Sequence, residues 1–203
     1  MEKFVFGITG ATGAGKSTVS QLLRKKGVQI IDADLVAREI TSSNKECIRE
    51  IKENFGLSVF NDDNSLNRKA LARIVFTNKD KLKLLNRITH KYIKDEIERQ
   101  IDISACQYIG IDGAVIIGSP VHNLCKWIVA VIADNEIRLE RIMSRDKISR
   151  QMAQNRINSQ MSNKQYEEYA DFIIINNDDN VRLEECIEQL YNKIKDFSKT
   201  EKT

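Results

Sequence analysis

The glycine-rich segment from Gly10 to Ser17 constrains the fold of this chain more than any other feature. It matches the pattern G-x-x-x-x-G-K-[ST], with Gly15 and Lys16 at two of the fixed positions. A phosphate chain requires backbone N–H groups turned toward it with no Cβ in the way, and glycine adopts the necessary backbone angles at little cost. The segment therefore predicts a phosphate-binding loop.

The residues on either side of this loop agree with that interpretation. Phe4–Ile8 predicts a short buried strand before it, and Ser17–Lys26 predicts a helix after it, ended by Gly27. The bound phosphates would then lie at a helix N-terminus, where free N–H groups and the helix dipole favour anions.

The loop indicates nucleotide chemistry, and other segments narrow its class. We expect Lys16 to reach the outer phosphates and the Ser17 hydroxyl to help hold Mg²⁺. GTPases usually carry Asn-Lys-x-Asp, and no Asn-Lys pair of this chain has Asp at that spacing; Leu-Ser-Gly-Gly-Gln of the transporter ATPases is also absent. Phosphoryl transfer from ATP to a small molecule is therefore favoured. The residues expected to bind ATP are Thr12, Gly13, Ala14, Gly15, Lys16, Ser17 and Thr18.

Length and composition limit the remaining choices. A chain of 203 residues with 41% hydrophobic and 30% charged residues is typical of one globular domain that carries small inserted lobes. No apolar run approaches ~20 residues and a core strand begins near the start, so we expect neither a membrane span nor a signal peptide. A formal charge of +3 is too small to indicate nucleic acid. Four separated cysteines predict reduced thiols in a cytoplasmic protein.

Apolar runs and helical periodicities alternate along the chain. Beyond the first strand, short strands are predicted at 28–31, 108–112, 127–132 and 172–175, with helices between them. This alternation is typical of an α/β fold with a five-stranded parallel sheet flanked by helices. We expect residues 1–35 and 104–203 to form the core, with a polar, basic flap or lid at 146–162. Residues 36–103 are expected to form a mostly helical insertion that binds the acceptor.

An acidic cluster follows the second predicted strand, at the strand end where open α/β sheets bind ligands. Asp34 could accept the proton of an attacking hydroxyl group, or it could be a helix N-cap. Asp112, at the end of another strand, could orient Mg²⁺ through water or merely end the strand.

Basic residues raise similar alternatives. Arg138, Arg141 and Arg145 share one helical face, which could either neutralise the moving phosphoryl group or be solvated. His90 lies in an apolar helical stretch, where a hydrogen-bonded core histidine is the common role.

Taken together, these features resemble the dephospho-coenzyme A kinase family over nearly the whole chain. The resemblance is carried by Gly7–Gly10, Gly13–Thr18, Ile31–Asp34, Ala37-Arg38, Phe55-Gly56, Leu66–Arg68, Leu85-Asn86, His90, Leu139–Arg145, Gln160, Ala170-Asp171 and Asn176-Asn177. Asp-Ala-Asp at this distance after the phosphate loop is more selective than the loop itself.

The resemblance implies a P-loop NTPase fold of the nucleotide-kinase type, a helical domain that receives dephospho-coenzyme A, and an arginine-bearing lid. It implies Asp34 as the base toward the ribose 3′-hydroxyl and Arg141 and Arg145 as lid arginines near the phosphates. It also implies ATP and Mg²⁺, with Asn176 at the ATP site. Arg38, His90 and Gln160, together with Asp34, are implied as acceptor-binding residues.

The chain departs from the family at two places. The usual His-Pro is His90-Lys91, and the stretch Asp112–Gly118 lacks the proline and the glutamate of the family's Asp-Val-Pro-Leu-Leu-Phe-Glu-like segment. The sequence thus predicts an ATP- and Mg²⁺-dependent dephospho-coenzyme A kinase, a monomer or weak homo-oligomer. A nucleoside or nucleotide kinase of the same fold, or a catalytically weakened nucleotide-binding protein, remains an alternative.

Overall fold

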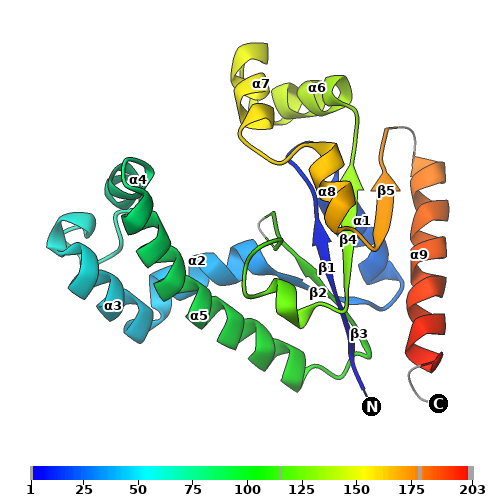
Figure 1. The fold of residues 1–203 in the computed structure, drawn as a ribbon, viewed down its shortest axis with the longest axis horizontal. Helices are drawn as coiled ribbons and strands as arrows, with labels where there is room; N and C mark the ends of the chain where they lie inside the picture. Colours follow the sequence, from blue (N-terminus) through cyan, green and yellow to red (C-terminus); the bar gives the residue numbers. More distant parts are fainter. Residues whose placement is uncertain (1, 115, 178–179, 201–203) are drawn as a thin grey trace. The chain divides into compact units, whose positions relative to one another are not determined.

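A computed structural model describes residues 2–114, 116–177 and 180–200 (Figure 1). The chain divides into two compact units, which we call the core unit (residues 1–31 and 104–203) and the helical unit (residues 32–103). Each unit is described separately below.

The core unit is built on a five-stranded parallel sheet in the order β2-β3-β1-β4-β5. Its strands are β1 (Phe4–Thr9), β2 (Gln29–Asp32), β3 (Tyr108–Asp112), β4 (Trp127–Ile132) and β5 (Phe172–Ile175). Because β1 is central, the loop that follows it emerges at the carboxyl edge between β3 and β4. This topology confirms the α/β fold predicted from the sequence.

Alternation along the strands assigns each sheet face to a different helix layer. Val129 and Val131 of β4 join the large core cluster with α1 (Lys16–Lys25) and α9 (Asn180–Thr200). Their neighbours Ala130 and Ile132 face the other way and pack with Tyr166 of α8 (Asn163–Tyr169). Each fully buried Val, Leu or Ile contributes about 1.5–3 kcal/mol relative to leaving it exposed.

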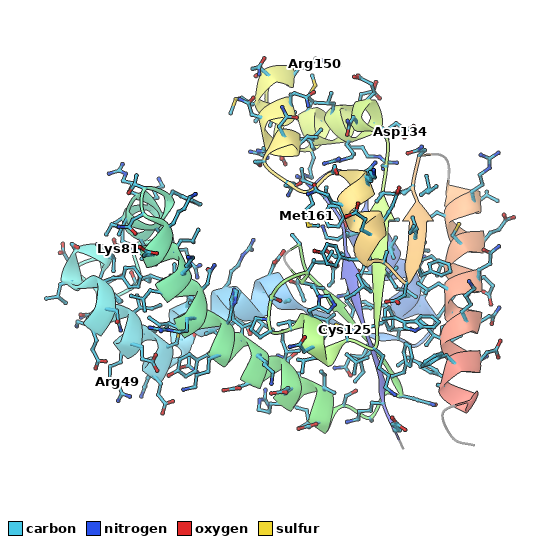
Figure 2. The ribbon with its side chains drawn as sticks, viewed as in Figure 1. Arg49, Lys81, Cys125, Asp134, Arg150 and Met161 are labelled. Atoms are coloured by element: carbon cyan, nitrogen blue, oxygen red, sulfur yellow. The ribbon has the colours of Figure 1, made fainter. Side chains whose placement is uncertain are left out.

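Helices α6 (Asn135–Asp146) and α7 (Arg150–Asn158) pack together through a small apolar cluster that includes Leu139 and Ile157. Arg150 is labelled at the start of α7 in Figure 2. Its Nη2 donates to both carboxylate oxygens of Glu136 of α6, at 2.8 Å to Oε1 and 2.6 Å to Oε2. The segment expected to be a polar flap therefore contains an ordered helix, and Arg141 and Arg145 belong to α6, before that flap.

The helical unit consists of α2 (Ala33–Ser43), α3 (Lys45–Phe55), α4 (Arg68–Phe76) and the long α5 (Lys79–Ile103). Helix α5 packs against the other three, and their apolar faces meet in a buried set. That set includes Val36, Ile40, Ile51, Leu71, Val75, Ile88 and Ile97. Residues 36–103 are thus mostly helical, as the sequence predicted.

Candidate functional site

The phosphate loop connects β1 to α1, and its glycines have backbone angles that other residues rarely adopt. Gly15 has φ 95° and caps the N-terminus of α1. Lys16 begins the helix and turns back, so that its Nζ donates to the Gly10 carbonyl at 2.9 Å. The N-terminus of α1 therefore lies at the loop, where the helix dipole favours an anion.

Asn176 and Arg141 hold the second half of this loop through its backbone carbonyls. Asn176, only 7% exposed, donates from Nδ2 to the Ala14 carbonyl at 2.8 Å. Arg141 donates from Nη1 to the carbonyls of Gly13 and Asn176, at 3.3 and 2.9 Å. The structure places both residues on the loop backbone; their contact with ATP stays a prediction.

Thr12, in the first half of the loop, is held at three atoms. Its N–H donates to Gln160 Oε1 at 2.8 Å, and its carbonyl accepts from Arg138 Nε at 3.0 Å. Its Oγ1 accepts from Arg145 Nη2 at 3.4 Å. Helix α6 and the segment after α7 therefore fix this residue together, and Gln160 lies at the phosphate loop.

These bonds also orient the donors left for a ligand. The C=O and N–H of a planar trans peptide point in opposite directions, and the described chain contains no cis peptide. Holding the carbonyls of Thr12 and Ala14 therefore turns the N–H groups of Gly13 and Gly15 the other way. Neither N–H bonds to another residue in the described part of the chain, so both suit a phosphate.

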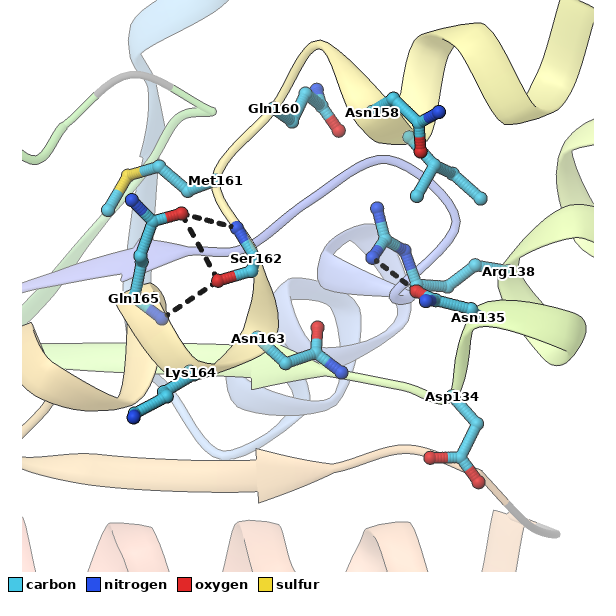
Figure 3. Close-up of a pocket in the computed structure, with 11 residues that line it drawn as sticks. Asp134, Asn135, Arg138, Asn158, Gln160, Met161, Ser162, Asn163, Lys164 and Gln165 are labelled. Carbon is cyan, nitrogen blue, oxygen red and sulfur yellow. Dashed lines mark hydrogen bonds between the residues drawn. The ribbon is translucent and has the colours of Figure 1, made fainter.

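The three arginines on one face of α6 differ in environment. Arg138 is 1% exposed, so the solvated interpretation is wrong for it. Figure 3 shows Arg138 bonded to Asn135, in the wall of a polar pocket that Gln160 also lines. Burial lowers the pKa of Arg138. Arg145 is exposed and is paired differently.

Asp146 joins two of the basic side chains. It accepts from Arg145 Nε at 2.8 Å and Nη2 at 3.0 Å, and it also accepts from Arg156 Nη1 of α7. The bond from Arg145 is the main reason why the pKa of Asp146 is lowered. This carboxylate therefore keeps two guanidinium groups side by side near Thr12.

The expected Mg²⁺ ligands belong to the core unit. Ser17 is exposed in the first turn of α1, and Asp112 ends β3. Asp112 accepts at Oδ2 from Ser20 Oγ at 2.7 Å, and its second oxygen has no partner among the described residues. Hydroxyl and carboxylate oxygens are ligands that Mg²⁺ prefers, so these residues fit the ion.

In the helical unit, the N-cap of α2 is Asp32, whose Oδ1 accepts from the Leu35 N–H at 2.8 Å. Asp34 is the second residue of α2, so the alternative that it is the N-cap is wrong. Arg38, on the same helix, lines a mostly apolar pocket of about 330 Å³ with Arg68 and Phe76. His90 is half-buried on α5, and burial lowers its pKa below 6.5.

Known proteins match this chain over almost its full length. The dephospho-CoA kinase family model matches residues 4–182. A dephospho-CoA kinase of Fusobacterium nucleatum is 36% identical, covering 98% of this chain and 100% of that protein. The chain belongs to the dephospho-CoA kinase family.

Solved structures agree with the family assignment. TT1252 from Thermus thermophilus has a TM-score of 0.80 and 27% identity, covering 96% of this chain and 97% of its own. Dephospho-CoA kinase from Campylobacter jejuni has a TM-score of 0.67 and 28% identity, covering 94% and 96%. Among the helices of the described residues, none is both long and apolar enough to cross a membrane.

The two departures from the dephospho-CoA kinase pattern have different structural settings. Lys91, in place of proline, lies inside the continuous helix α5. In the other stretch Val115 lies outside the described residues, while Gly118, in place of glutamate, has φ 76°. Neither position lies in the phosphate loop.

Sequence reasoning missed helix α8 and the ring of contacts on Thr12. A signal for α8 exists: Ser162-Asn163-Lys164-Gln165 has the S-x-x-Q pattern of a capping box, and the structure contains both of its bonds. The Thr12 contacts have no local signal, because their partners lie more than a hundred residues away.

Proposed function

We propose that this chain transfers the γ-phosphoryl group of ATP to the ribose 3′-hydroxyl of dephospho-coenzyme A. The O–P bond to ADP breaks, a bond to the acceptor oxygen forms, and the hydroxyl proton is released. The proposal rests on the dephospho-CoA kinase family match over residues 4–182, together with a complete phosphate loop.

The phosphate loop supplies the donors for the ATP phosphates. The N–H groups of Gly13 and Gly15 and the N-terminus of α1 attract the anion. Lys16 exchanges the Gly10 carbonyl for the outer phosphates, since a bound anion is a better partner for an ammonium group than a carbonyl. Thr12 and Thr18 are the remaining loop residues that contact ATP in this proposal.

Mg²⁺ fits beside this loop, where Ser17 would ligate it directly and Asp112 would hold it through water. The ion neutralises charge on the transferred phosphoryl group. Ser20 orients the Asp112 carboxylate through the 2.7 Å bond. Arg145 of α6 stabilises the same negative charge on the phosphoryl group. Arg141 holds the loop backbone and faces the nucleotide.

Asp34 is the base that accepts the 3′-hydroxyl proton. Assignment of the N-cap to Asp32 supports this role, because the structural alternative for Asp34 no longer holds. The helical unit receives the acceptor: Arg38 pairs with its anionic phosphates, and His90 contributes a neutral imidazole at pH 7. Gln160, which accepts from the Thr12 N–H, is the remaining acceptor-binding residue of this proposal.

The deciding experiment incubates the protein with ATP, Mg²⁺ and a panel of hydroxyl acceptors, and identifies products by mass. A gain of ~80 Da, one phosphoryl group, on dephospho-coenzyme A alone is the expected result. Phosphorylated nucleosides or nucleotides instead would show that the acceptor is a nucleoside or nucleotide. Nucleotide binding without any product would show that the chain is a nucleotide-binding protein and not a kinase. Lys16→Ala is the control, since it should abolish transfer to every acceptor while leaving the fold intact.

A further inference from the structure

Arg138 carries a buried positive charge that the protein itself does not neutralise. The side chain is 1% exposed, and its Nη2 atom is buried without a hydrogen-bond partner. Its other two nitrogens donate only to neutral oxygens, Thr12 O at 3.0 Å and Asn135 Oδ1 at 3.3 Å. Within the described ranges it forms no ion pair with an Asp or Glu side chain.

Its neighbours on the same pair of helices are arranged in the opposite way. Arg145 is exposed and paired with Asp146, and Arg150 is exposed and paired with Glu136. A surface arginine hardly needs a carboxylate, whereas a buried one is costly to fold without it. Of these three arginines, the buried Arg138 is the one without a carboxylate partner; Arg141 of α6, which is partly buried, likewise donates only to carbonyl oxygens.

The position of this charge relative to the phosphate loop indicates what its anion is. Arg138 Nε binds the Thr12 carbonyl, so the guanidinium lies behind the Thr12–Gly13 peptide. A Cβ built on Gly13 would lie 2.9 Å from the Arg138 carbonyl oxygen, so helix α6 itself abuts the loop. The Gly13 N–H points to the opposite side, where the phosphates bind. A single peptide separates the buried cation from the anion site, and the bond to its carbonyl polarises the N–H that faces the ligand.

We propose that Arg138 is a positioning residue whose uncompensated charge is neutralised by the phosphates of the bound nucleotide, through the Thr12–Gly13 peptide. The ligand-free protein bears the cost of burying the charge, and polyphosphate binding recovers it. Burial lowers the pKa of Arg138, because desolvation disfavours its charged form. The proposal rests on the phosphate loop of the proposed function and does not depend on the identity of the acceptor.

The test measures binding of tripolyphosphate and of adenosine by calorimetry, without acceptor, so that a wrong acceptor assignment does not affect it. Arg138→Gln keeps a donor for the Thr12 carbonyl and removes the charge, whereas Arg138→Met removes both. Arg150→Gln is the matched control, the same change at an arginine that has its own carboxylate.

Arg138→Gln and Arg138→Met should both weaken tripolyphosphate binding about tenfold or more, as a unit charge within a few ångströms at an effective dielectric of about 20 implies. Adenosine binding should not change, and Arg150→Gln should bind both as wild type does. The ligand-free stability of Arg138→Gln, from urea unfolding, should be no lower than that of wild type.

Three results would overturn the proposal. Wild-type tripolyphosphate affinity in Arg138→Gln would show that the charge is not used. If Arg138→Met lost tripolyphosphate affinity and Arg138→Gln kept it, only the hydrogen bond to the Thr12 carbonyl would matter. If Arg138→Gln failed to fold while Arg150→Gln folded, the charge would be stabilising the ligand-free protein, contrary to the proposal.

Discussion

Replacing Gly15 with alanine should destabilise the protein in two ways, through backbone strain and through a clash with Asn176. Gly15 has φ 95°, and an L-residue in a left-handed conformation costs roughly 1–2 kcal/mol. A Cβ at this position would also lie 2.1 Å from Asn176 Nδ2, far inside contact distance. Asn176 must then move and give up its 2.8 Å bond to the Ala14 carbonyl.

That bond is buried, so water cannot replace it, and its loss costs about 1 kcal/mol. Gly15→Ala should therefore destabilise the protein by roughly 2–3 kcal/mol, the sum of the strain and the lost bond. Gly27→Ala is the matched control: Gly27 has φ 84° with no heavy atom within 4 Å of the added Cβ, so it carries the backbone cost alone.

Urea unfolding of both variants measures the difference, and calorimetry with ATP measures the effect on the loop. Asn176→Ala supplies a double-mutant cycle, because a small residue at 176 removes the clash. The double variant should be less destabilised than the sum of the single variants by about 1 kcal/mol. Equal destabilisation by Gly15→Ala and Gly27→Ala, or strict additivity with Asn176→Ala, would refute the packing argument.

Three further predictions concern the site and its surroundings. Asp34→Asn should lower kcat by ~10²-fold or more with little change in the KM for dephospho-coenzyme A, and near-normal turnover would leave the reaction without this base. Arg145→Ala should lower kcat by on the order of 10³-fold while ATP affinity changes much less, which steady-state kinetics and calorimetry can compare. Because burial lowers the pKa of His90, the unfolded state binds its proton more readily; stability should be complete above pH 6.5 and fall below it. His90→Gln should flatten that decline in urea unfolding from pH 7.5 to 5, and an unchanged slope would contradict it.

The sequence by itself determined the parts of this protein that depend on a few adjacent residues. The glycine spacing from Gly10 to Ser17 predicted the phosphate loop, because backbone angles near a phosphate restrict residue type directly. Apolar runs and helical periodicity predicted the five strands and most helices, because strand and helix present their side chains with different periods. Resemblance to the dephospho-CoA kinase family predicted the chemistry, and the family assignment is confirmed.

Only the tertiary structure decided how these parts support one another. Arg138 and Arg145 share one predicted helical face, yet one is buried behind the loop and the other is exposed, because α6 meets the loop near its first turns. The choice of Asp32 over Asp34 as N-cap depended on where β2 ends, which a one-residue shift would alter. Asn176 holds Ala14 across 162 residues of sequence. Local patterns cannot specify such contacts, since they arise when strands distant in the chain become neighbours in the sheet.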